Sequence, residues 1–250
     1  MKRMSGIVSY DGTGFSGYQI QPDQRTVQGT IEQVLQRINK GKFIRTVASG
    51  RTDSGVHGVG QVFHFDSTLS IESAAWKRAL NTLLPADIRI QSVANEDPDF
   101  HARFDVEAKE YRYRLLRKPD EDVFRRNYTY HFPYELDLVG MRSAAELLVG
   151  EHDFTSFSSA KTEVMDRIRT IHKLDIEEAG DELVISIEGN GFLYNMVRII
   201  VGTLLEVGTS KRQVEDIIRI LEMKDRDAAG KTAPAHGLYL WKVTYKNRDK

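Results

Sequence analysis

The first half of the chain alternates short apolar runs with segments whose apolar residues recur at the spacing of a buried helix face. Between Thr26 and Lys40, for example, Val27, Ile31 and Val34 fall on one such face. This pattern predicts four strands and two helices in the order β-α-β-β-α-β. The strands are expected at about 4–11, 42–49, 60–66 and 87–94, and the helices at about 26–40 and 71–84.

The second half shows the same alternation with one helix more. Asp137 is a good residue for a helix N-cap, and Ser210 and Gln213 stand at the spacing of a capping box. Strands are expected at about 109–117, 168–177, 182–189 and 236–245, and helices at about 138–149, 192–208 and 211–222. We therefore predict an α+β protein of two tandem split β-α-β-β-α-β units, with antiparallel sheets, helices packed on them and a cleft between the halves. The halves are expected at residues 1–104 and 105–250.

The amino-acid composition excludes several classes of protein that would be compatible with this pattern. The 250 residues include no cysteine, which excludes a disulfide scaffold and a thiolate metal site. The formal net charge is −1, so a nucleic-acid partner would require positive charge concentrated on one surface. No apolar stretch at the N-terminus has the length of a signal peptide, and Asn195 and Arg198 interrupt the most apolar run. We expect a cytoplasmic protein without a membrane span.

A glycine-rich segment, "GRTDSGVHGVG" from Gly50 to Gly60, is the first candidate site. So much flexible backbone weakens a loop, so its presence implies a turn or a close approach to another group. Asp53 is then either a turn residue or a catalytic carboxylate presented by the loop. His57 and His64 stand nearby, but they lack the spacing of metal ligands, and no metal site is expected.

Arg198 stands in a helix that is otherwise apolar on nearly every side. A guanidinium cannot lose its proton, so its burial requires an anionic partner or a polar cavity. One interpretation is an arginine whose head reaches water, and the other is an arginine that pairs with Asp53. Gly202, one turn further along, would let another backbone come close.

Two further patterns have both a structural and a functional interpretation. In "YRYRLLR", Tyr111, Tyr113 and Leu115 share one strand face and two arginines share the other, which suits base stacking and phosphate contacts as well as an ordinary core. "GTGFSG", Gly12 to Gly17, matches a dinucleotide fingerprint, but no helix follows it directly. We expect a structural loop there.

Together these segments resemble the tRNA pseudouridine synthase A family along nearly the whole chain. The resemblance rests on "YDGTGFSGYQIQ", "GRTDSGVHGVGQVFHF", "FHARFDVEAKEYRYRL", "GFLYNMVRIIVGTLLEVG" and "APAHGLYL". The family usually has alanine where this chain has Ser54 and Gly58. Both residues are small, so the loop is expected to remain functional.

The resemblance implies an isomerase that converts uridine to pseudouridine in the anticodon arm of tRNA, at tRNA positions 38, 39 and 40. It implies that Asp53 is the catalytic nucleophile and that Arg198 pairs with it. Tyr111 would pack on the flipped-out uracil, Arg51 would enter the RNA in its place, and Leu238 would line the uracil pocket. It also implies a homodimer that needs no metal or organic cofactor.

Two other classes stay open on the residues alone. A non-catalytic RNA-binding protein would use the aromatic residues but not the pair of Asp53 and Arg198. A hydrolase would need a metal set or a nucleophilic triad, and the sequence offers neither in a recognisable form.

Overall fold

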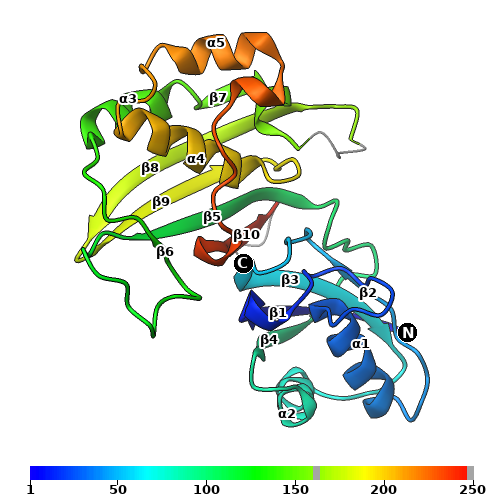
Figure 1. Ribbon diagram of the computed structural model, residues 1–250. Helices are drawn as coiled ribbons and strands as arrows, with labels where there is room; N and C mark the ends of the chain where they lie inside the picture. Colours follow the sequence, from blue (N-terminus) through cyan, green and yellow to red (C-terminus); the bar gives the residue numbers. More distant parts are fainter. Residues whose placement is uncertain (160–163, 247–250) are drawn as a thin grey trace. The chain divides into compact units, whose positions relative to one another are not determined.

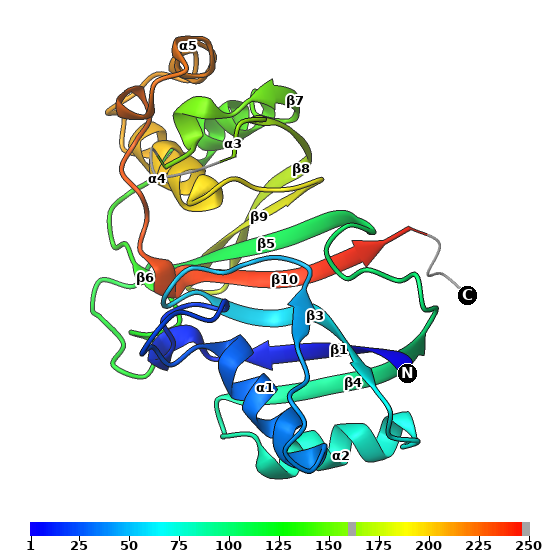
Figure 2. The same cartoon turned by 90° about the vertical axis from the view of Figure 1, so that its right-hand side faces the viewer.

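A computed structural model describes residues 1–159 and 164–246 of the chain. The chain forms two compact units, the first comprising Met1–Glu107 and Tyr239–Lys250 and the second Ala108–Leu238 (Figures 1 and 2). The first boundary lies close to the one expected after residue 104. The last strand, which the sequence analysis assigned to the C-terminal half, groups with the first unit.

The first unit is a sheet with two helices. Its strand order is β4-β1-β3-β10, with β2 on β3, and all pairs are antiparallel except β10 with β3. The elements are β1 (Lys2–Tyr10), α1 (Val27–Ile38), β2 (Thr46–Ala48), β3 (His57–Ser67), α2 (Ser73–Leu83), β4 (Ile88–Glu96) and β10 (Leu238–Tyr245). Both helices bury their apolar faces in one core with Phe63 and Phe65 of β3, and they lie next to each other in Figure 2.

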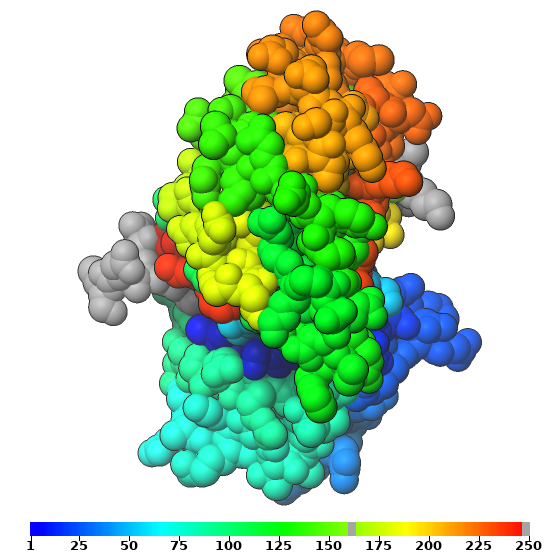
Figure 3. All heavy atoms as spheres, turned by 60° about the vertical axis from the view of Figure 1, so that its left-hand side comes forward, coloured from blue at the N-terminus to red at the C-terminus, as the bar shows by residue number. Residues whose placement is uncertain are grey.

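The second unit is built on the strand order β5-β9-β8-β7, antiparallel throughout, with the short β6 parallel to β5. Its elements are β5 (Val106–Leu116), β6 (Tyr130–His131), α3 (Leu138–Glu146), β7 (Gly150–Asp153), β8 (Ile168–Ala179), β9 (Glu182–Gly189), α4 (Met196–Gly208) and α5 (Asp216–Met223). Figure 3 shows α3, in green, beside the orange spheres of the α4–α5 region. Short 3-10 helices complete the chain, at Gly12–Gly14, Thr155–Phe157, Arg226–Ala228 and Ala235–Gly237.

The predicted mixture of helices and largely antiparallel strands is confirmed, and Asp137 caps α3 as expected by accepting the Gly140 N–H at 3.0 Å. The predicted capping box at Ser210 and Gln213 was wrong. Ser210 has a left-handed backbone (φ 56°) and closes the end of α4, while α5 begins only at Asp216.

In the part of the chain that the structure describes, no helix has the length and hydropathy of a membrane span.

Candidate active site

The glycine-rich loop with Asp53 is packed against the "GTGFSG" loop of the same unit. A Cβ on Gly12 would overlap the Val56 carbonyl oxygen, and one on Gly17 would lie 2.7 Å from the Thr52 carbonyl oxygen. Gly17 and Gly55 also have positive φ angles, of 86° and 79°. Gly12 and Gly17 therefore let the two loops approach each other backbone to backbone, while Gly60 lets the Trp241 backbone come close on another side.

Hydrogen bonds fix the residues on either side of Asp53. The Thr52 carbonyl accepts the Tyr18 N–H at 3.0 Å, and the Thr52 hydroxyl meets the Tyr10 hydroxyl at 2.8 Å. The Asp53 carbonyl accepts the Val56 N–H at 3.1 Å and closes a turn. Asp53 itself is half-buried. It stands on a backbone that is held from both sides.

The two departures from the family's usual loop sequence fit this packing. The Ser54 hydroxyl donates to the Phe15 carbonyl at 3.2 Å and adds a bond between the two loops. Gly58 lies directly under the Tyr10 ring, which an added Cβ would overlap. Arg51 is exposed, and within the described residues its guanidinium makes no hydrogen bond or ion pair.

Arg198 lies on α4, whose other residues are almost all buried. Its Nε donates to the Ala233 carbonyl at 2.7 Å and its Nη1 to the Asn195 side-chain oxygen at 2.9 Å. The guanidinium is therefore held by the protein instead of extending into water. The backbone that supplies Ala233 passes α4 at Gly202, where a Cβ would overlap the Lys231 carbonyl oxygen. The expected close approach at Gly202 is confirmed.

Tyr111 and Tyr113 lie on the buried face of β5, as their alternation predicted. Tyr111 is 7% exposed and meets the Phe192 ring edge to face at 5.1 Å. On the other face, Arg112 pairs with Glu110 at 2.6 Å and Arg114 with Glu182 at 2.7 Å. These two arginines are thus largely neutralised within the protein.

Leu238 is 5% exposed and begins β10, directly after the turn at Ala235–Gly237. The structure thus brings Asp53 and Arg51 together in one loop of the first unit. It places Arg198, Tyr111 and Leu238 in the second unit.

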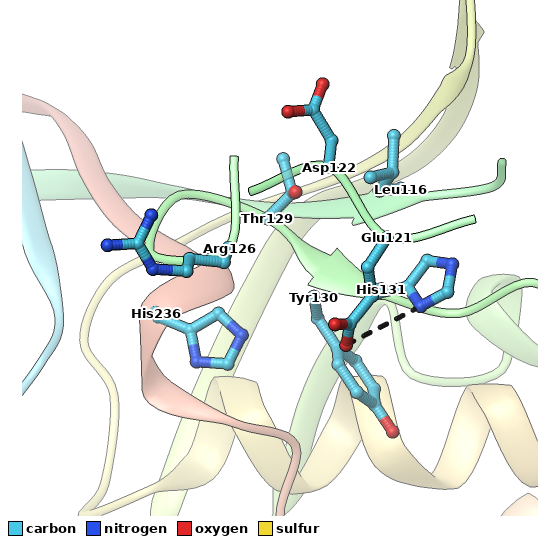
Figure 4. A pocket seen from close by; sticks show the side chains of 8 residues that line it. All are labelled: Leu116, Glu121, Asp122, Arg126, Thr129, Tyr130, His131 and His236. Carbon is cyan, nitrogen blue, oxygen red and sulfur yellow. Dashed lines mark ion pairs between the residues drawn. The ribbon is translucent and has the colours of Figure 1, made fainter. Parts of the chain in front are cut away.

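A separate cavity of about 190 Å³ lies in the second unit beside β6 (Figure 4). It is lined by Leu116, Glu121, Asp122, Arg126, Thr129, Tyr130, His131 and His236. His131 faces Glu121 there, with 3.9 Å between Nδ1 and the carboxylate. None of the predicted site residues lines this cavity. Across residues 1–159 and 164–246, no three His, Asp or Glu side chains gather in the arrangement of a metal site.

Sequence analysis did not identify the groups that orient the predicted residues. Ala233 holds Arg198 through its backbone oxygen, which no residue type reveals. Asn195 precedes Arg198 by three positions, so its contact could have been found from helical spacing. Tyr10 and Thr52 meet only in the folded unit.

An aspartate on a fixed loop and an arginine held within the protein are candidate catalytic groups, and comparison with known proteins identifies the class of enzyme as the pseudouridine synthases. A family model described as tRNA pseudouridine synthase matches residues 7–105 and 144–246. The chain belongs to this family, whose members are isomerases that form pseudouridine from uridine in tRNA.

Individual relatives match the chain along its whole length. A protein of a Geobacillus species named tRNA pseudouridine synthase A is 59% identical over 98% of this chain and 99% of its own. One of the same name from Halalkalibacterium halodurans is 58% identical over 95% of this chain and 90% of its own. A solved structure, "Crystal Structure of a Cbf5-Nop10-Gar1 Complex", aligns at a TM-score of only 0.32 and 15% identity, over 80% of this chain and 54% of that one.

Proposed function

We propose that this protein converts uridine to pseudouridine in the anticodon stem-loop of tRNA, with Asp53 as the nucleophile on a flipped-out uridine. The observation that carries the proposal is the Asp53 loop, whose backbone is held by the Tyr18 N–H and packed against the glycines of the neighbouring loop, while Tyr10 holds the Thr52 hydroxyl. A nucleophile that must meet one nucleotide in one geometry benefits from such pre-organisation.

The reaction breaks the N1–C1′ bond of the nucleotide, turns the uracil and forms a C5–C1′ bond, after which the C5 proton leaves and N1 carries one. Atoms balance without any co-reactant. A carboxylate that attacks the nucleotide and leaves again divides this change into easier steps. Removing the uridine from the stack costs a few kcal/mol.

Each remaining residue has a role in this proposal. Tyr111 packs on the uracil, a kind of contact worth about 1–3 kcal/mol for a base on an aromatic ring. Arg51, exposed and without a protein partner among the described residues, enters the RNA where the uridine has left. Leu238 lines the uracil pocket with an apolar surface.

We infer that Arg198 pairs with Asp53 and favours its ionised form. The support is chemical: a guanidinium on an otherwise apolar helix requires an anionic partner or a polar cavity, and Ala233 and Asn195 hold this one in a fixed orientation. The inferred architecture is two tandem split units, with the aspartate from the N-terminal half and the arginine from the C-terminal half, and the active-site cleft between them. The order β1-α1-β2-β3-α2-β4 of the first unit supports this.

We further propose a cytoplasmic homodimer, because the family resemblance implies this form and pairing two copies would lengthen the RNA track. Light scattering at assay concentration is expected to give twice the mass of the chain. An active monomer would contradict the dimer without affecting the proposed reaction.

Tritium release tests the reaction itself. tRNA transcripts labelled with ³H at C5 of uridine are expected to lose tritium to water on incubation with the enzyme, from uridines of the anticodon arm. Transcripts with those uridines replaced by cytidine serve as the control. Binding without tritium release would favour a non-catalytic RNA-binding protein, and strand cleavage would favour a hydrolase.

A further inference from the structure

Residues 230–234, here named the crossing segment, run across α4 next to Arg198. The Gly230 N–H donates to the Thr203 hydroxyl at 2.9 Å, and the Ala233 N–H donates to the Arg198 carbonyl at 3.0 Å. Side chains are excluded at the closest approach: a Cβ on Gly230 would lie 2.7 Å from the Thr203 Cα, and one on Gly202 would overlap the Lys231 oxygen. The start of the crossing segment is therefore fixed by α4 itself.

The end of the crossing segment is held from β5. Tyr113 donates its hydroxyl to the Pro234 carbonyl at 2.8 Å. Its ring is fully buried and packs under the turn that follows, where a Cβ on Gly237 would lie 2.8 Å from the ring. Burial also raises the pKa of Tyr113, so its hydroxyl keeps the proton that it donates.

The Pro234 carbonyl is adjacent along the chain to the Ala233 carbonyl, which accepts the Arg198 Nε–H at 2.7 Å. The two carbonyls belong to consecutive peptides joined at Pro234, whose ring fixes one of the two torsions between them. A bond that holds the Pro234 carbonyl therefore restricts rotation of the peptide that carries the Ala233 carbonyl. The orientation of the guanidinium plane therefore depends on a hydroxyl group from another element, β5. Loss of an outer-shell hydrogen bond that orients a metal ligand commonly costs about 10- to 100-fold in activity, and we expect an effect of the same order for Arg198.

We propose that Tyr113 is a positioning residue for Arg198: its hydroxyl holds the Pro234 carbonyl and thereby restricts the preceding peptide, whose Ala233 carbonyl sets the orientation of the guanidinium. This inference rests on the proposed function, in which Arg198 acts on Asp53. It assigns Tyr113 a role different from that of Tyr111, which shares its strand face.

The test compares Tyr113→Phe with Tyr245→Phe. Tyr245 is also buried and also donates its hydroxyl to a backbone carbonyl, that of Ala102, at 2.7 Å in the first unit. Both substitutions remove one buried hydrogen bond and are expected to lower the unfolding temperature alike. Only Tyr113→Phe should lower kcat, by about 10- to 100-fold, with KM for tRNA changed less than about twofold.

Two further readouts separate positioning from mere stability. The activity of Tyr113→Phe should reach half its maximum at higher pH than that of the parent, in the same direction as Arg198→Met. In a double-mutant cycle, Tyr113→Phe should cost little when Arg198 is already methionine. The Arg198 Nε–H resonance, identified by its loss in Arg198→Met, should exchange with water faster in Tyr113→Phe at a temperature where both proteins are folded.

Equal kcat in the two tyrosine variants, an unshifted pH profile or additive losses in the cycle would each overturn the inference. The proposed function would survive these results as long as the parent releases tritium and Arg198→Met is impaired. A parent-like Arg198→Met would overturn the pairing with Asp53, and the role of Tyr113 with it.

Discussion

At the scale of single residues, the charge of Arg198 is the feature of α4 that packing alone does not explain. Methionine at this position would keep the helix and much of the volume. We predict that Arg198→Met folds but loses most activity near neutral pH, because Asp53 loses the charge that favours its ionised form. Its residual activity should rise with pH along a curve displaced upward from the parent's, measured by single-turnover tritium release.

Lysine at position 198 tests whether activity needs only a positive charge or also the shape of the guanidinium. The Arg198 guanidinium uses Nε and Nη1 for two different partners, which an ammonium group cannot reproduce. Arg198→Lys should therefore restore little activity. Parent-like activity in Arg198→Met would instead mean that the charge at Asp53 is balanced by another group.

His64 provides a prediction about stability and pH. It is buried in the first unit, and its Nδ1 accepts the Ala102 N–H at 3.0 Å. Burial, with the nearby charges of Arg3 and His101, lowers its pKa to about 4 from 6.5, although Asp66 and Asp105 oppose the shift. On acidification, the His64 imidazole is therefore protonated near pH 6.5 in the unfolded chain but only near pH 4 in the folded protein.

The free energy of unfolding should therefore fall on acidification across this window, by about 1–3 kcal/mol. Denaturant unfolding at steps between pH 7 and 4 would measure the decrease. His64→Asn can accept the same hydrogen bond but does not titrate, so its stability should depend less on pH over this range. An equal slope in the two proteins would assign the effect to other groups.

At the scale of elements, the contact between α4 and the crossing segment has no room for a side chain at Gly202. We predict that Gly202→Ala displaces the crossing segment, costs about 1–3 kcal/mol of stability and lowers kcat through Arg198. Gly29→Ala in α1 is the control. Its Cβ would meet side-chain atoms and no backbone, namely the hydroxyl of the N-cap Thr26 at 3.0 Å and the Ile20 side chain at 3.6 Å, and alanine favours a helix. Equal activity losses in the two variants would contradict the prediction.

Helices and strands could be predicted from sequence where a capping residue or a hydrophobic period marks them. Asp137 revealed the start of α3, and the alternation of Tyr111 and Tyr113 revealed the buried face of β5. Strands β6 and β7 were missed because two or four residues are too short to show a period. The start of α5 was wrong because the backbone at Ser210 closes α4 instead of opening a new helix.

Contacts between segments far apart in the sequence were harder to predict. Gly202 indicated that some backbone comes close, but not that residues 230–234 would supply it. The pairing of β10 with β3 joins segments far apart in sequence, and no local pattern encodes it. The candidate site residues could be recognised because they depart from local preferences. Glycines cluster around Asp53, and Arg198 is a charged residue in an apolar run.

At the scale of the whole molecule, a formal net charge of −1 gives no global attraction for RNA. Binding of tRNA should nevertheless weaken steeply with salt, with a slope of log K against log salt of about −0.7 to −0.9 for each phosphate contact. Because Arg51 is exposed and lies beside Asp53, Arg51→Gln should reduce that slope, by about one if Arg51 meets a phosphate. Arg78→Gln, at an exposed position on α2, is the comparison. Salt-independent binding would mean that the basic residues do not face RNA.

The account depends most on Asp53 as the nucleophile. Asn at this position nearly preserves the shape of the side chain and should leave the loop packing against Gly12 and Gly17 intact. The decisive measurement is single-turnover tritium release by Asp53→Asn at saturating tRNA, with binding measured in parallel. We predict no detectable release and an affinity for tRNA close to the parent's. Release within about tenfold of the parent rate would contradict the central claim, since loss of an essential nucleophile has a far larger effect.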